Sequence, residues 1–126
     1  MANTTKRVRW VGSSKKDLQS LPKAVRQNVG KALWDAQEGE VPPGTKILHG
    51  FGGGSVLEIR ADHDGNAYRA AYTIRLGEFV YVLHVFQKKS KKGSKTPAGV
   101  MELIRKRLRI AEEHYEQWKG TEGNPA

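Results

Sequence analysis

The sequence predicts one α+β domain in which helices pack on an antiparallel sheet. Three runs in the middle of the chain, at residues 55–61, 67–75 and 79–86, are rich in β-branched and aromatic side chains, as strands are. On both sides of these runs, apolar residues recur every three or four positions, which indicates amphipathic helices. The 126 residues are enough for a single modest core, so residues 1–126 are taken as one domain.

The N-terminal part predicts a strand followed by helix. Residues 6–11 alternate charged and apolar side chains, which is typical of a short strand with one face in water. A helical region follows, and Pro22 is compatible with a fresh helix start capped by Ser20, so two helices or one kinked helix are both expected. Its apolar stripe is formed by Leu18, Leu21, Val25, Val29, Ala32, Leu33 and Ala36.

The three central strands are expected to form a meander. Their connections at residues 62–66 and 76–78 are short and rich in turn-forming residues, so neighbouring strands should run antiparallel. The last helix is expected over about residues 97–118, with Thr96 as N-cap and Pro97 in the first helical position. Residues 1–5 and 119–126 are expected to be flexible ends.

The chain is strongly basic, with 22 Lys and Arg against 13 Asp and Glu and a formal net charge of +9. Such a surface attracts nucleic acid, an anionic membrane or an acidic protein. No long apolar span and no apolar signal-peptide core are present, so a membrane partner is not expected. The absence of cysteine excludes disulfides and thiolate chemistry and fits a cytoplasmic protein.

Positive charge is concentrated between the third central strand and the last helix. Arg60 and Arg69 lie on the two preceding strands and would join the same surface if the strands pair as a meander. A rigid edge of this kind suits a polyanion; the alternative is a solvated basic face that forms only surface ion pairs. The lysines of this stretch are Lys88, Lys89, Lys91, Lys92 and Lys95.

Strand alternation places further polar groups on this surface. Glu58 and Arg60 share one face of their strand, and Arg69 lies on the more polar face of the next strand. A phosphodiester gains negative charge as it is cleaved, and arginine and lysine side chains aimed at it would stabilise that charge. The pattern therefore predicts a phosphate-binding face.

Other motifs predict no metal or cofactor. The glycine-rich residues 50–54 precede a strand rather than a helix and lack a following Gly-Lys-Ser/Thr, so they indicate a flexible turn and not a phosphate loop. Residues 62–66 lack the frame of a calcium loop and are interpreted as a hairpin turn. The histidines show no metal-ligand spacing; His84 is expected to be a satisfied core residue, and only His49 is retained as a candidate.

Four short segments together resemble a known family. They are LEIR (57–60), YRAAY (68–72), VLHVFQKK (82–89) and TP (96–97), and in this order they resemble the phage Gp49-like branch of the RelE/ParE toxin superfamily, which contains HigB-type toxins. The resemblance covers roughly residues 8 to 115. It implies a RelE-like α+β fold and a toxin of a type II toxin–antitoxin system. RelE- and HigB-like members are ribosome-dependent mRNA endoribonucleases.

The resemblance also implies roles for single residues. Arg69 matches the arginine of the family's Tyr-Arg pair, which contacts the scissile phosphate. Lys88 and Lys89 match the basic pair after the last strand, and Arg60 matches the arginine that closes the previous strand. RelE-like enzymes often add a tyrosine or histidine near the C-terminus, but here Tyr115 lies on the apolar stripe of the last helix, so the general base is not identified.

The implied reaction is attack of a ribose 2′-hydroxyl on its own 3′-phosphate, which needs no metal and leaves a cyclic phosphate. Glu58 is the candidate proton acceptor. Further RNA-binding residues are expected to be Lys46, His49, Lys91, Lys92 and Lys95.

The implied partners are mRNA, the ribosome and a cognate antitoxin, expected to be a helix-turn-helix protein of the HigA type. Two other functions stay open from the sequence. One is a ParE-like gyrase inhibitor that shares the fold but cleaves no RNA. The other is a non-catalytic nucleic-acid-binding or phage regulatory protein.

Overall fold

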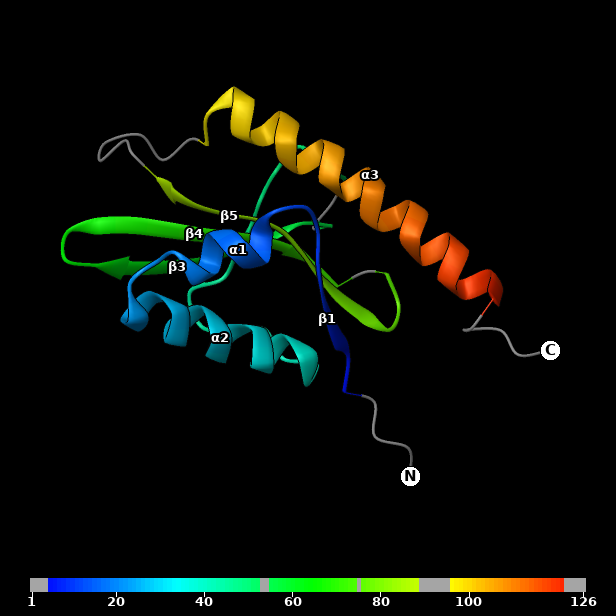
Figure 1. Ribbon diagram of the computed structural model, residues 1–126, viewed down its shortest axis with the longest axis horizontal. Helices are drawn as coiled ribbons and strands as arrows, with labels where there is room; N and C mark the ends of the chain where they lie inside the picture. Colours follow the sequence, from blue (N-terminus) through cyan, green and yellow to red (C-terminus); the bar gives the residue numbers. More distant parts are fainter. Residues whose placement is uncertain (1–4, 53–54, 75, 89–95, 122–126) are drawn as a thin grey trace.

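A computed structural model of the chain describes residues 5–52, 55–74, 76–88 and 96–121. Five strands and three helices occur in these ranges, and their order along the chain confirms the α+β prediction (Figure 1). They are β1 (Arg7–Trp10), α1 (Ser14–Gln19), α2 (Lys23–Gln37), β2 (Lys46–Ile47), β3 (Leu57–His63), β4 (Asn66–Thr73), β5 (Phe79–Lys88) and α3 (Ala98–Thr121).

The strands form one sheet in the order β1-β5-β4-β3-β2. The meander of β3, β4 and β5 is antiparallel, as expected, whereas β1 pairs with β5 in parallel. The sequence predicted four strands and missed β2, which pairs antiparallel with β3 through only Lys46 and Ile47. A two-residue strand is too short for an alternation of apolar and polar side chains to be recognised.

The hairpin between β3 and β4 is closed by a two-residue turn. Asp64 and Gly65 both have positive φ, 51° and 76°, as a type I′ turn requires. Glycine adopts this conformation without strain, and aspartate is one of the few other residues that tolerate it. The turn fixes the register of the hairpin from the pair His63 and Asn66 onward, so Arg60 lies directly opposite Arg69.

The N-terminal helical region is two helices. The first backbone hydrogen bond of α2 joins the N–H of Arg26 to the carbonyl of Pro22 at 3.0 Å. The expectation that Ser20 caps this helix is wrong, because its hydroxyl donates to the Asp17 carbonyl at the end of α1.

The ends of the domain differ from the sequence prediction. Helix α3 begins at Ala98, and the Pro97 carbonyl accepts its first hydrogen bond, so Pro97 precedes the first helical position. The helix continues to Thr121, so the expected flexible end at 119–121 is helical. At the other end, the Thr5 hydroxyl donates to Glu38 at 2.9 Å. Residues 1–4 and 122–126 lie outside the described residues.

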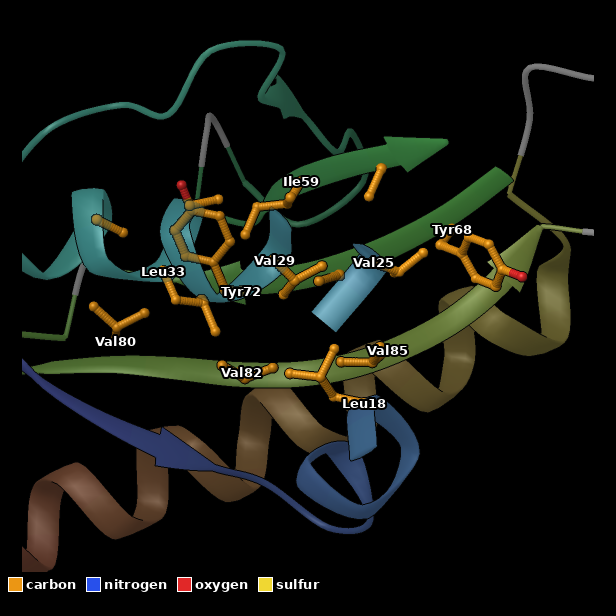
Figure 2. Close-up of a cluster of buried hydrophobic side chains, with 14 residues drawn as sticks. Leu18, Val25, Val29, Leu33, Ile59, Tyr68, Tyr72, Val80, Val82 and Val85 are labelled. Atoms are coloured by element: carbon orange, nitrogen blue, oxygen red, sulfur yellow. The ribbon is translucent and has the colours of Figure 1, made fainter. Parts of the chain in front are cut away.

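The sheet separates two hydrophobic cores. Helices α1 and α2 cover one face and α3 crosses the other (Figure 1). Figure 2 shows the first core, where side chains of α1 and α2 meet those of the sheet: Leu18, Val25, Val29, Leu33, Ile59, Tyr68, Tyr72, Val80, Val82 and Val85. The second core joins α3 to the sheet and contains Val11, Val56, Ala71, Phe79, Tyr81, Leu83, Ile104, Leu108 and Ala111.

In the part of the chain that the structure describes, none of the helices combines the length and the apolar character needed to cross a bilayer.

The first core gives a test of the packing. Leu33 is 3% exposed and Trp34, its neighbour on α2, is 56% exposed. Leu33→Ala should lower the free energy of unfolding by about 2–5 kcal/mol, since it removes buried methyl groups and leaves a cavity. Trp34→Ala should cost less than about 1 kcal/mol, because much of that side chain is in water in the folded state. Urea denaturation of both variants measures the difference, and equal losses would contradict this packing.

Candidate functional site

The α3 side of the sheet carries a polar surface beyond the second core. Arg69 on β4 pairs with Arg60 on β3 and with Phe86 on β5, and it lies two residues from Ala71, which belongs to the core under α3. Strand alternation therefore places all of these side chains on the α3 side. We call the surface the cationic face and define it as Lys46, Glu58, Arg60, Asp62, Arg69, His84, Phe86 and Lys88.

A β-bulge in β5 brings three of these residues onto the cationic face. Ala71 pairs with His84, but the next residue of β4 pairs with Val82, so Leu83 is an extra residue in β5. Leu83 lies in the core under α3, and His84 is opposite Ala71 of the same core. A bulge shifts the alternation by one. Phe86 and Lys88 therefore follow His84 onto the α3 side.

Arg69 is held at the floor of the face. Its side chain is only 5% exposed, and its Nη1 donates to the Tyr68 carbonyl at 2.8 Å and to Oδ1 of Asp62 at 3.1 Å. Its Nε lies 3.8 Å from Oε1 of Glu58, which is also buried. Among the described residues, Nε of Arg69 and Oε2 of Glu58 have no hydrogen-bond partner. The guanidinium is thus held by hydrogen bonds to Asp62 and to the Tyr68 carbonyl, and Glu58 adds a longer ion pair.

The other charged residues of the face are more accessible. Lys46 and Arg60 are exposed, and Lys88 is half-buried. Four cationic side chains against Glu58 and Asp62 leave the face with a formal charge of +2. The strands pair as the expected meander and place Arg60 directly opposite Arg69 on one side of the sheet, but Arg60 is exposed and Arg69 is buried.

The remaining predicted site residues are not among those that the structure places on the cationic face. His49 is exposed and follows β2, outside the paired part of the sheet. Four further lysines, Lys89, Lys91, Lys92 and Lys95, lie outside the described residues, so their predicted roles stay predictions.

His84 was expected in the core, but it lies half-buried on the cationic face. Its ring stacks on that of Phe86, with centroids 5.0 Å apart and an interplanar angle of 14°. Its Nδ1 lies 3.3 Å from Nη1 of Arg107 on α3. Burial, and next the Arg107 guanidinium, lower the pKa of His84, with Asp17 acting in the opposite direction. The imidazole is therefore neutral at neutral pH.

The expectation about Tyr115 can be compared with the structure. Tyr115 packs against the second core and stacks on Trp118, with ring centroids 5.8 Å apart, which confirms its place on the apolar stripe of α3. Within the described ranges, no three histidine, aspartate or glutamate side chains are grouped closely enough to hold a metal ion.

The comparison with protein families agrees with this architecture. Residues 16–109 match the family described as phage derived protein Gp49-like (DUF891), and the match includes every residue of the cationic face. The chain belongs to the Gp49-like family. This is a toxin family of the RelE/ParE superfamily, and the five-stranded sheet with its helices is consistent with the RelE-like fold. None of the curated proteins matches the chain.

The buried pair of the Gp49-like chain predicts a stability pattern. Arg69→Met should lower the free energy of unfolding by about 3–5 kcal/mol, because it leaves the Glu58 carboxylate buried without its cation. Asp62→Asn should cost less than about 1 kcal/mol, because the Asp62 side chain is 67% exposed. Replacing both buried partners, Glu58→Leu with Arg69→Met, should recover much of the loss. Chemical denaturation measures all three, and a wild-type stability for Arg69→Met alone would refute the pairing.

Proposed function

We propose that the chain is the toxin of a type II toxin–antitoxin system and cleaves mRNA on the ribosome. Membership of the Gp49-like family supports a toxin of the RelE/HigB type. The observation that carries the nuclease proposal is the pairing of Arg60 with Arg69, on the sheet face that also bears Lys88. A cluster of cations held on strands suits a phosphodiester whose charge increases during cleavage.

The proposed reaction is an internal transfer of a phosphoryl group. The ribose 2′-oxygen forms a bond to the adjacent phosphorus, the bond from phosphorus to the 5′-oxygen breaks, and a 2′,3′-cyclic phosphate remains. The 2′-hydroxyl loses a proton and the leaving 5′-oxygen gains one, so no net proton is consumed. Arg60 and Lys88 neutralise the non-bridging oxygens in this proposal, and Lys88 or Lys89 assists the leaving oxygen.

Arg69 and Glu58 take roles that fit their burial. The Asp62 side chain is 67% exposed, so its bond to Arg69 can be exchanged for one to a phosphate oxygen at small cost. Arg69 then contacts the phosphate from the floor of the face. Glu58 is the proton acceptor proposed for the 2′-hydroxyl; its carboxylate oxygen without a hydrogen-bond partner among the described residues is buried, so this role requires that RNA binding uncovers it.

The proposed partners follow from charge. A chain of net charge +9 is expected to be masked by an acidic segment of the antitoxin, with carboxylates over the cationic face. Lys46, His49, Lys91, Lys92 and Lys95 are proposed to meet RNA when the antitoxin is absent. The antitoxin and the ribosome would therefore compete for one surface.

The activity is tested by inducing the chain in cells and mapping mRNA 5′ ends. Wild type should give discrete cuts within translated codons. Arg60→Ala with Lys88→Ala should lower cutting by at least about 100-fold and abolish growth inhibition, because two contacts to the developing negative charge are lost. This pair avoids Arg69, whose loss would also destabilise the fold.

A matched control removes two exposed lysines of α2, which lies on the opposite side of the sheet: Lys23→Ala with Lys31→Ala. This control lowers the net charge equally and should leave the cuts unchanged. DNA damage without mRNA cuts would favour a gyrase inhibitor instead. An absence of both effects on induction would favour a non-catalytic binding protein.

Ribosome binding should depend strongly on salt. Each phosphate contact by lysine or arginine releases counterions, so the affinity of the free toxin for ribosomes should fall steeply between low and high salt. Sedimentation with ribosomes at several salt concentrations measures this, and the complex with antitoxin should bind far less at each of them. An affinity that stays flat with salt, or equal binding by the complex, would contradict the shared surface.

A further inference from the structure

Helix α3 fixes the orientation of one ring on the cationic face. Arg107 places Nη1 3.3 Å from Nδ1 of His84 and 3.1 Å from the Leu83 carbonyl, and Nη2 3.1 Å from the Ser13 hydroxyl. The guanidinium also packs on Gly12, where a Cβ would lie 2.7 Å from Nε and the backbone has φ of +59°. Arg107 is thus held on several sides.

The chemistry of this contact determines the tautomer of His84. Arginine has only hydrogen-bond donors, so Nδ1 of His84 must be the acceptor, and in the neutral ring the proton then resides on Nε2. Burial beside Arg107 lowers the pKa of His84, so the neutral ring is the form present at neutral pH. A neutral imidazole with Nδ1 occupied presents one group for further binding, the Nε2–H donor.

The position of the His84 ring places it near the residues proposed to bind the phosphate. His84 lies two residues before Phe86, which pairs directly with Arg69, and four residues before Lys88 on the same face. His84 and Arg69 are therefore diagonal neighbours on adjacent strands, so their side chains leave the same side of the sheet at positions about 7 Å apart, and a phosphate over this face is within reach of both. The parallel stack on Phe86 further restricts rotation of the ring.

We propose that His84 binds the phosphate as a neutral hydrogen-bond donor through Nε2–H, and that Arg107 is the positioning residue that imposes this tautomer. His84 would touch a non-bridging oxygen of the RNA phosphate and would not accept the proton of the 2′-hydroxyl. This inference rests on the proposed function for its substrate. It adds a catalytic residue that the sequence prediction did not include.

Three substitutions distinguish a donor from a base. His84→Gln can place an amide N–H near the position of Nε2, so it should keep cleavage within about fivefold of wild type, whereas His84→Ala should lose roughly 100-fold. His84→Asn should resemble the alanine variant, because its shorter amide reaches only the Nδ1 position. If the folded glutamine variant is as inactive as the alanine variant, a hydrogen-bond donor is not sufficient at this position and the proposal is overturned. Full activity of the alanine variant would overturn it as well.

A measurement without cleavage tests the tautomer directly. Long-range proton–nitrogen NMR spectra of the ¹⁵N-labelled chain should show the His84 proton on Nε2, and millimolar inorganic phosphate should shift that resonance. Arg107→Met should raise the fraction protonated on Nδ1, whereas Arg107→Lys, which keeps a donor, should restore the wild-type spectrum. Ser13→Ala removes a contact of Arg107 away from His84 and should change neither result. A proton on Nδ1 in wild type, or no response to phosphate, would overturn the proposal.

The cleavage assay and the NMR measurement together distinguish a failure of this inference from a failure of the proposed function. A chain that cuts no RNA, but whose His84 resonance shows Nε2–H and moves with phosphate, would refute the nuclease while the donor stands. A chain that cuts RNA, but whose glutamine variant is inactive, would refute the donor while the nuclease stands.

Discussion

The register of β4 between its two neighbours is the constraint on which the site depends. On one side, the two-residue turn at Asp64 and Gly65 aligns Arg60 with Arg69. On the other side, the bulge at Leu83 shifts β5 by one residue. Because side chains alternate along a strand, a slip of one residue in the pairing of β3 or β5 with β4 would move the site residues of that strand to the opposite side of the sheet, into the first core. The turn and the bulge therefore build the site before any contact between its side chains is considered.

Burial of Arg69 shows how the fold tolerates a charge at the edge of its core. A guanidinium taken out of water is costly unless it is paired and hydrogen-bonded, and Arg69 has Glu58, Asp62 and a carbonyl for this purpose. The pairing is incomplete, since Nε and one Glu58 oxygen lack hydrogen bonds within the described residues. Buried polar groups in native proteins are nearly always hydrogen-bonded, so these two exceptions call for an explanation, and a role in catalysis is one that agrees with the proposed function.

Much of this architecture could be predicted from the sequence because its signals are local. The apolar stripe of α2, the Asp-Gly turn and the β-branched run of β5 each lie within one short segment. The elements that were missed depend on tertiary contacts. The two residues of β2 are recognised as a strand only through their pairing with β3. The bulge places both Leu83 and His84 on the α3 side, so strict alternation gave no reason to place His84 with Arg69.

Helix α3 links the second core to the cationic face and to the loop that follows β2. Its buried side, through Ile104 and Leu108, packs on the sheet. Between these residues, Arg105 lies over the Phe51 ring at 5.1 Å and donates to the Gly50 carbonyl at 3.4 Å, near β2. Arg107, two residues further on, reaches the bulge of β5. Helical residues two apart point to nearly opposite flanks, so the two arginines contact different segments: Arg105 the loop after β2, and Arg107 the bulge that bears His84. The packing of α3 and the geometry of the site are therefore coupled, since a shift of the helix would move both arginines together.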